Sequence, residues 1–284
     1  MKVAYLGPPG TFTEKVAKQV FPNLELTPFS IMSGVVFAVE NKKTDYGVVP
    51  LENFYNGDVR PTLDALRKCI RTKIIAERAL QVVHCLGVLP GVRKIEYIYS
   101  KDQALEQCGD YLFRNFPEAN EIPVSSTSEA AQRVVRENLL EAAAIAPKET
   151  LIQAGLEVIA EDLCPNNKTR FAVIARENTQ PTGNDKTLLA FNPPEKDRSW
   201  ILCDLLGYFK ALEINITSLF TRPDVTPTRR GYWFYIEVQA HERDRKLLTA
   251  IRGIRNYLDP TNKIPFASII KSLGSYRDSK WVEI

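Results

Sequence analysis

The sequence predicts an α/β protein whose first part forms two lobes and whose second part is a smaller, ferredoxin-like βαββαβ domain. Strand-like apolar runs alternate with helical patterns through about the first 180 residues, as in a mostly parallel sheet covered by helices. Residues 178–185 then read Asn-Thr-Gln-Pro-Thr-Gly-Asn-Asp, a stretch rich in turn formers. We place the domain boundary there and predict domains at residues 1–182 and 186–284.

The predicted strands of the first domain fall into two groups. Those near residues 3, 47 and 172 share one character, and those from 82 to 145 form a contiguous block. We therefore expect two lobes with a cleft between them. In chain order, apolar runs and helical periodicity predict strand 2–6, helix 13–20, strand 46–50, helix 61–69, strands 81–88 and 95–100, helices 102–113 and 129–138, strand 142–146, helix 148–154 and strand 171–175.

The second domain has a different order of elements. The same criteria predict strand 186–191, helix 199–212, strands 215–221 and 231–239, helix 244–257 and strand 266–273. This βαββαβ order is typical of ferredoxin-like domains, which commonly bind small ligands or partner copies.

The composition excludes several classes of protein. The chain has 284 residues with 44% apolar and 25% charged content, and a net charge of +3, which is ordinary for a globular protein and indicates no nucleic-acid surface. Neither a secretion signal nor a run of about 18 apolar residues is present, so we expect a cytoplasmic protein with no membrane partner.

Cysteine and histidine give no sign of a metal site or a disulfide framework. The five cysteines form no Cys-x-x-Cys pair, and the only histidines are His84 and His241. Both histidines are therefore interpreted as structural, and His84 as part of the core.

Three helix starts carry polar side chains that suit an anion. Thr11-x-x-Glu14 and Ser126-x-x-Glu129 fit capping boxes, and Asn56-Gly57-Asp58 precedes the helix predicted at 61–69. Each is open to a purely structural interpretation as a cap or tight turn. Together around one cleft they would bind a small polyanion without a metal.

The run Asn167-Lys168-Thr169-Arg170-Phe171 places a hydroxyl beside a guanidinium at the start of a predicted buried strand. This pair suits an anionic substrate with a leaving hydroxyl, because arginine grips carboxylates in bidentate fashion. The alternative for Arg170 is a structural partnership with a buried acid such as Asp162.

These motifs resemble the prephenate dehydratase family over nearly the whole chain. The resemblance rests on residues 5–14 (Tyr-Leu-Gly-Pro-Pro-Gly-Thr-Phe-Thr-Glu), residues 45–53 (Asp-Tyr-Gly-Val-Val-Pro-Leu-Glu-Asn) with Gly57 and residues 62–64, residues 103–108, Ser126-Thr127 and Thr169-Arg170-Phe171. It implies a catalytic domain with the two-lobed fold of periplasmic binding proteins, followed by an ACT domain.

The resemblance also implies an activity and a site. The substrate would be prephenate, a cyclohexadiene with two carboxylates and a ring hydroxyl, which loses carbon dioxide and water without a cofactor or metal. Thr169 would donate a proton or hydrogen bond to the leaving hydroxyl, Arg170 would clamp a carboxylate and Phe171 would shape the pocket. The other expected substrate-binding residues are Asn53, Thr11, Ser126, Thr127 and Gln103.

The chain departs from the family pattern at several positions. Phe54 replaces a usual serine, Lys101-Asp102 replaces His-Pro, and in the ACT region residues 199–201 and 220–223 differ from the usual Gly-Ala-Leu and Glu-Ser-Arg-Pro. The expected effector residues are Ser199, Trp200, Asn215, Thr221 and Arg222, with phenylalanine as candidate effector. Because the bulky Trp200 would fill an amino-acid pocket, the alternative is a domain that serves chiefly as a contact within a homo-oligomer, a dimer or tetramer.

Two other functions stay open on the sequence. One is a prephenate decarboxylase that removes carbon dioxide without aromatisation, suggested by Phe54 beside Asn53. The other is a non-catalytic sensor of amino acids or keto acids, because binding-protein-like and ACT modules both bind small molecules.

Overall fold

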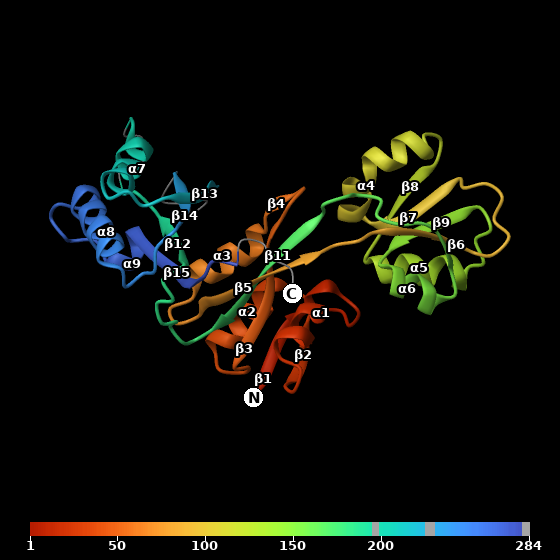
Figure 1. The fold of residues 1–284 in the computed structure, drawn as a ribbon, viewed down its shortest axis with the longest axis horizontal. Helices are drawn as coiled ribbons and strands as arrows, with labels where there is room; N and C mark the ends of the chain where they lie inside the picture. Colours follow the sequence, from red (N-terminus) through yellow and green to blue (C-terminus); the bar gives the residue numbers. More distant parts are fainter. Residues whose placement is uncertain (195–198, 225–230, 280–284) are drawn as a thin grey trace.

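A computed structural model describes residues 1–194, 199–224 and 231–279 as three bodies. A first lobe lies at the centre, a second lobe extends to one side of it, and a C-terminal sheet with its helices lies on the other side (Figure 1). The mixed α/β fold agrees with the sequence prediction. Residues 280–284 of the predicted second domain lie outside the described residues.

The first lobe is built on the sheet β2-β1-β3-β11-β5, with β4 paired to β3. Its strands are β1 (Lys2–Leu6), β2 (Glu25–Phe29), β3 (Tyr46–Asn53), β4 (Gly57–Asp58), β5 (Lys73–Gln81) and β11 (Lys168–Ala175), and its helices are α1 (Phe12–Val20), α2 (Met32–Glu40) and α3 (Arg60–Lys68). β1 is parallel to β2 and β3, whereas β11 is antiparallel to both β3 and β5. The expectation of a mostly parallel sheet is therefore wrong, because β5 and β11 carry the chain out to the second lobe and back.

The second lobe has its own sheet, β10-β6-β9-β7-β8. Its elements are β6 (Cys85–Val88), β7 (Tyr97–Lys101), α4 (Asp102–Asn115), β8 (Asn120–Val124), α5 (Thr127–Arg136), β9 (Ala142–Ala146), α6 (Lys148–Ala154) and β10 (Glu157–Ala160). The strands near residues 3, 47 and 172 share the first sheet, and those between 85 and 146 share the second. The two predicted groups of strands therefore lie in two separate sheets.

Several segments differ from the prediction, and β4, β8 and β10 were not predicted. The strand predicted at 81–88 begins only at Cys85, as β6, because the chain crosses between the lobes at residues 82–84. Gln81 is the last residue of β5, a strand that the sequence did not predict. β2 and α2 lie in residues 21–45, which the sequence left unassigned. α2 escaped notice because its β-branched Val35, Val36 and Val39 are all buried, so it lacks the clear polar face of a surface helix.

The C-terminal body is a four-stranded antiparallel sheet in the order β13-β14-β12-β15. Its elements are β12 (Asp185–Phe191), α7 (Ile201–Ala211), β13 (Ile216–Pro223), β14 (Tyr232–Val238), α8 (Arg245–Leu258), α9 (Phe266–Ile269) and β15 (Ile270–Arg277). The predicted βαββαβ order is present, with the four-residue α9 where the last strand was expected to begin.

The C-terminal sheet packs directly on the first lobe. One apolar cluster joins Leu51 and Ile74 of the first lobe to Leu188, Tyr235 and Leu273 of the C-terminal sheet. A Cβ at Gly274 (φ +144°) would come within 2.2 Å of the Ile74 carbonyl oxygen, so only glycine allows this close approach. The two bodies therefore share a core.

Candidate functional site

A cavity of about 810 Å³ lies between the two lobes. The first lobe contributes the turn before α1 and the segment from β4 to the start of α3. The second lobe contributes the starts of α4 and α5, and Val82 and His84 line the cavity at the crossing between lobes. The expected cleft is present, and residues far apart in the chain converge on it.

Thr169 lines this cavity, as the proposed chemistry requires. Its side chain is largely buried, and the amide Nδ2 of Asn53 donates a hydrogen bond to its Oγ1 at 2.9 Å. Because Oγ1 accepts this bond, its own hydrogen can be donated to another oxygen. Phe171 follows two residues later on the same strand face and also lines the cavity.

A chain of buried amides fixes Asn53 and ties the two lobes together. Asn53 also donates to Asn167 Oδ1 at 2.8 Å and accepts from Gln107 Nε2 at 3.1 Å. Gln107 belongs to α4 of the second lobe, and its Oε1 accepts from Asn167 Nδ2 at 2.9 Å. The orientation of Asn53, and so of the Thr169 hydroxyl, is set by side chains from both lobes.

His84 extends this amide network. Its Nε2 lies 3.1 Å from Gln107 Oε1, and it is both buried and part of the cavity lining. Burial lowers the pKa of the imidazole, and the bond to Gln107 offsets this in part, so His84 is neutral near pH 7. The expectation that it is buried is correct, but its position at the cavity was not predicted.

Two predicted helix caps are present and lie at the cavity. Thr11 Oγ1 accepts from Glu14 N at 3.3 Å and donates to Leu6 O at 3.0 Å. Ser126 Oγ accepts from Glu129 N at 3.0 Å. Both hydroxyls serve the helix starts, so an anion here would meet the first-turn amides of α1 and α5 rather than the hydroxyl of Thr11.

The third predicted cap is wrong, although its residues border the cavity. α3 is capped by Val59 without a side-chain bond. Asn56 instead accepts hydrogen bonds from Gln103 and Gln107 of the second lobe, at 3.3 and 2.5 Å. Gln103 and Thr127 line the cavity as predicted.

Arg170 lies away from the cavity, contrary to the predicted carboxylate clamp. Successive side chains of a strand point to opposite faces, so Arg170 faces away from Thr169 and Phe171. Its side chain is 4% exposed and pairs with Glu52 at 2.9 Å, Glu77 at 3.0 Å and Glu237 at 2.7 Å. The alternative, in which Arg170 pairs with a buried acid for a structural purpose, is therefore favoured. Its partners are these three glutamates and not Asp162.

Asp58 lies beside this charge cluster. Asp58 on β4 stands opposite Glu52 in the ladder between β4 and β3. Arg170 on β11 stands opposite the same Glu52 in the ladder between β11 and β3. Burial and the neighbouring Glu52 carboxylate raise the pKa of Asp58 to about 6. Its carboxyl group therefore titrates near neutrality.

Two cations that the sequence analysis did not assign to the site line the cavity instead. Arg60 comes from the first turn of α3, and Lys101 precedes α4 on the second lobe. Lys101 departs from the family pattern, and its position directly before a predicted helix is the signal in the sequence that favours it as a site residue. These side chains can meet carboxylates from opposite sides of the cleft.

The predicted effector residues are spread over the surface of the C-terminal body. Ser199 is exposed, Trp200 is 77% exposed, and Asn215 Nδ2 donates to Gln239 Oε1. Arg222 pairs with Asp64 of α3, whereas Thr221 is exposed on β13. In this single chain Trp200 points to solvent and does not fill a pocket.

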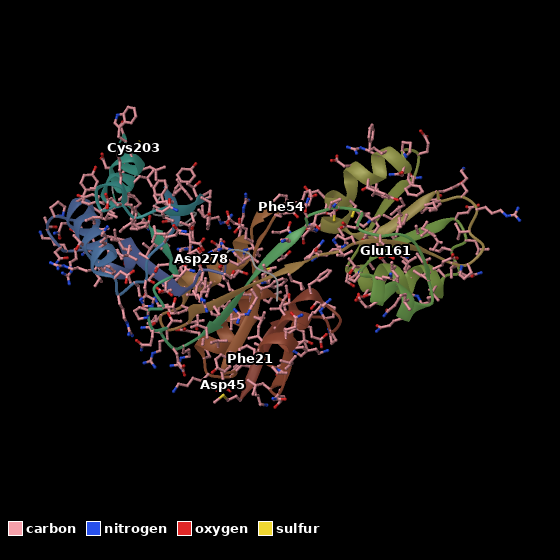
Figure 2. All side chains as sticks on the ribbon, viewed as in Figure 1. Phe21, Asp45, Phe54, Glu161, Cys203 and Asp278 are labelled. Atoms are coloured by element: carbon pink, nitrogen blue, oxygen red, sulfur yellow. The ribbon has the colours of Figure 1, made fainter. Side chains whose placement is uncertain are left out.

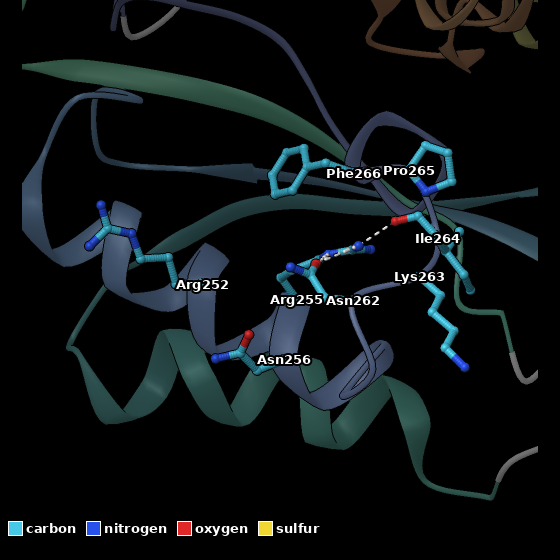
Figure 3. Close-up of a pocket in the computed structure, with 8 residues that line it drawn as sticks. All are labelled: Arg252, Arg255, Asn256, Asn262, Lys263, Ile264, Pro265 and Phe266. Carbon is cyan, nitrogen blue, oxygen red and sulfur yellow. Dashed lines mark hydrogen bonds between the residues drawn. The ribbon is translucent and has the colours of Figure 1, made fainter.

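A separate hollow of about 600 Å³ lies at the end of α8 and contains none of these effector residues. Arg255 crosses its floor beneath Phe266 and binds Asn262 and Ile264 (Figure 3). Its guanidinium also pairs with Asp259 at 3.0 Å. These bonds fix the loop between α8 and α9.

The parts of the chain that the structure describes contain no group of three or more metal-ligating side chains and no helix long and apolar enough to cross a membrane. All five cysteines are free thiols. The polar lining of the cavity consists of amides, hydroxyls, the imidazole of His84, the carboxyl group of Asp58 and two cations.

Comparisons with known proteins agree on one family. Residues 3–179 match the family model described as Prephenate dehydratase. A bifunctional chorismate mutase/prephenate dehydratase of Aquifex aeolicus is 33% identical over 280 residues, which cover 97% of this chain and 73% of that relative. The prephenate dehydratase of Lactococcus lactis subsp. cremoris is 34% identical over 241 residues, covering 83% of this chain and 85% of that one.

A solved structure gives the same result. The crystal structure of prephenate dehydratase from Arthrobacter aurescens in complex with L-Phe matches with a TM-score of 0.81 and 28% identity, covering 100% of this chain and 92% of that chain. Fold and site define a two-lobed enzyme of the lyase class. The chain belongs to the prephenate dehydratase family.

Phe54, which replaces the usual serine, lies at the end of β3 beside β4 (Figure 2). Its side chain is 62% exposed and packs edge-on against Tyr55. The residues that line the cavity at this point are Asn53 and Asn56. The substitution therefore leaves the described lining of amides in place.

Proposed function

We propose that this protein converts prephenate to phenylpyruvate in aromatic amino-acid biosynthesis, with release of carbon dioxide and water. The bond from the ring to its carboxylate breaks, and its electron pair enters the ring as the bond to the hydroxyl breaks. The departing hydroxide needs one proton to leave as water. The observation that carries the proposal is the Thr169 hydroxyl, fixed by Asn53 at the wall of the cavity between the lobes.

Thr169 is proposed as the group that assists this departure. Its Oγ1 accepts from Asn53, so its hydrogen can point at the leaving oxygen. A threonine hydroxyl is a weak acid, and such help contributes at most about 10²- to 10⁴-fold to the rate. Formation of the aromatic ring provides most of the driving force.

The rest of the site would hold the two carboxylates. The starts of α1 and α5 offer backbone amides and helix dipoles from opposite lobes. Arg60 and Lys101 of the cavity lining supply positive charge, the role that the sequence assigned to Arg170. Asn53, Gln103, Ser126, Thr127 and Phe171 line the remaining wall.

Turnover of prephenate tests the activity directly. The pure protein is incubated with prephenate, phenylpyruvate absorbance is followed, and the product is identified by mass spectrometry. We expect phenylpyruvate. A decarboxylated but non-aromatic product would support a decarboxylase, and binding without turnover would support a sensor; either result contradicts the proposal.

We further propose that residues 1–182 form a catalytic domain of the periplasmic-binding-protein type and residues 186–284 an ACT-type regulatory domain. The antiparallel sheet with order β13-β14-β12-β15 supports the second assignment. The L-Phe in the Arthrobacter aurescens complex supports phenylalanine as effector. The candidate effector residues are Ser199, Trp200, Asn215, Thr221 and Arg222.

Exposed Trp200 also favours contact with another copy of the chain. We propose a cytoplasmic homo-oligomer, a dimer or tetramer. Light scattering behind size exclusion measures its size, and titration of the protein with L-phenylalanine in a calorimeter tests the effector. A monomer, or the absence of binding heat, would refute the respective assignment.

A further inference from the structure

The C-terminal sheet contributes a carboxylate to the charge cluster behind the cavity. Arg170 Nη1 donates to Glu237 Oε1 at 2.7 Å and to Glu77 Oε2 at 3.0 Å, and its Nη2 pairs with Glu52 at 2.9 Å. Glu52 and Glu77 lie on β3 and β5, the neighbours of β11 in its own sheet, whereas Glu237 lies on β14. Arg170 thus links the sheet of the first lobe to the C-terminal sheet.

The C-terminal sheet itself fixes the position of Glu237. Thr217 Oγ1 donates to its Oε2 at 2.9 Å, and the Tyr276 hydroxyl donates to its Oε1 at 2.5 Å. Lys186 lies 3.6 Å from Oε2 and also pairs with Glu77 at 2.9 Å. A carboxylate that is 3% exposed and held in this way is a fixed anchor for Arg170.

The backbone connects this anchor to the cavity. Arg170 follows Thr169 on β11, and strand alternation places their side chains on opposite faces. The register with β3 shifts between Arg170, opposite Glu52, and Phe171, opposite Pro50. The extra residue of this bulge is Leu51, which lies on β3 next to Glu52. The ladder is therefore irregular where Arg170 pairs with Glu52, and we expect the ion pairs of Arg170 to take part in setting how β11 presents Thr169.

We propose that Glu237 is a positioning residue for the proposed dehydration: it holds Arg170 and, through β11, sets the Thr169 hydroxyl against the substrate. The kinetic test of this role rests on the proposed function, because it measures turnover of prephenate. The C-terminal sheet then contributes to catalysis in the absence of any effector.

Glu237→Gln tests this with a matched control. The variant keeps the size of the side chain and an oxygen for Tyr276 but loses the charge that holds Arg170. We expect kcat to fall by about 10-fold or more with KM within about 2-fold, because misplacing a reacting group by about 1 Å costs up to 10²-fold. Asp259→Asn removes a buried carboxylate that pairs with Arg255 within the same body, and should lower Tm but keep kcat.

A double-mutant cycle separates positioning from general damage. In the Thr169→Val background, Glu237→Gln should cause no further loss of kcat, because its effect passes through the missing hydroxyl. Full additivity of the two losses, or an unchanged kcat in Glu237→Gln, would overturn the inference. If Glu237→Gln does not fold, Tyr276→Phe decides: it removes one donor to Glu237 and should lower kcat in the same direction.

A spectroscopic readout does not require turnover. The methyl resonance of Thr169, identified by its loss in Thr169→Ser, should shift in Glu237→Gln and stay in place in Asp259→Asn. No shift in Glu237→Gln would refute the positioning role. If the wild-type protein does not turn over prephenate, the proposed function fails while this measurement still tests the structural coupling.

Discussion

Thr169 and Arg170 are consecutive on β11, yet the Thr169 side chain lines the cavity while Arg170 is clamped between two sheets by three glutamates. The hydroxyl of Thr169 accepts a hydrogen bond from Asn53. One residue borders the cavity, and its neighbour ties the same strand to the C-terminal sheet.

Removing the Thr169 hydroxyl should slow the reaction more than it weakens binding. Thr169→Val keeps the shape of the side chain but cannot donate to the leaving oxygen, so kcat should fall by about 10²- to 10⁴-fold with little change in KM. Thr169→Ser keeps the hydroxyl and serves as the control. Equal losses in kcat and in substrate affinity would argue against the leaving-group role.

Asn53→Asp should inactivate the enzyme with the Thr169 hydroxyl still present. The carboxylate cannot donate to Oγ1, so the hydroxyl would turn its hydrogen toward Asp and no longer toward the substrate. We expect kcat to fall by about 10²-fold or more. The measurement is steady-state kinetics at a temperature where circular dichroism shows a folded protein.

Asn120→Asp, an exposed change of the same kind on β8, should keep wild-type rates. Wild-type turnover in Asn53→Asp would show that the Asn53 donor does not orient Thr169.

The raised pKa of Asp58 predicts how stability depends on pH. Burial and the Glu52 carboxylate raise its pKa to about 6 in the folded protein, from an unperturbed value of 3.8. The folded state therefore binds the proton more tightly, so stability falls as pH rises from about 4 to 6 and stays lowered above that. Because Asp58 is partly exposed, solvent screening weakens the effect of this pKa shift, and the free energy of unfolding changes by roughly 1 kcal/mol.

Asp58→Asn abolishes this titration and should raise Tm at pH 7.5, with the gain disappearing near pH 4. Thermal unfolding across this range measures it. Glu118→Gln removes an exposed carboxylate elsewhere and provides the control. A gain in Asp58→Asn that is equal at both pH values would disprove the assignment.

Gly274→Ala should be strongly destabilising. The new methyl group would lie 2.2 Å from the Ile74 carbonyl oxygen, on a residue with φ +144°. We expect a loss of about 3 kcal/mol or more in the free energy of unfolding, measured by urea denaturation.

Gly109→Ala is the matched control, because a Cβ there meets no atom within 4 Å and the residue lies inside α4. That change should be neutral or stabilising by about 0.5–1 kcal/mol. Similar stabilities for the two variants would mean that β15 and β5 approach less closely than described.

The sequence predicted most elements and much of the cavity wall, because both follow from local patterns. Caps at Thr11 and Ser126 and the run of β11 are examples. Strand alternation places Arg170 on the face opposite Thr169, but its partner Glu237 lies 67 residues away, and no local pattern encodes that partner. Gln107 was identifiable in principle, because it lies four residues after Gln103 on one helix face.

The close packing of Gly274 on Ile74 also limits how this protein can be re-engineered. A chimaera that exchanges the C-terminal domain for that of a relative would have to import the matching surface of β5 and α3 as well. A C-terminal domain packed in this way is therefore transplantable only together with the part of the first lobe on which it sits.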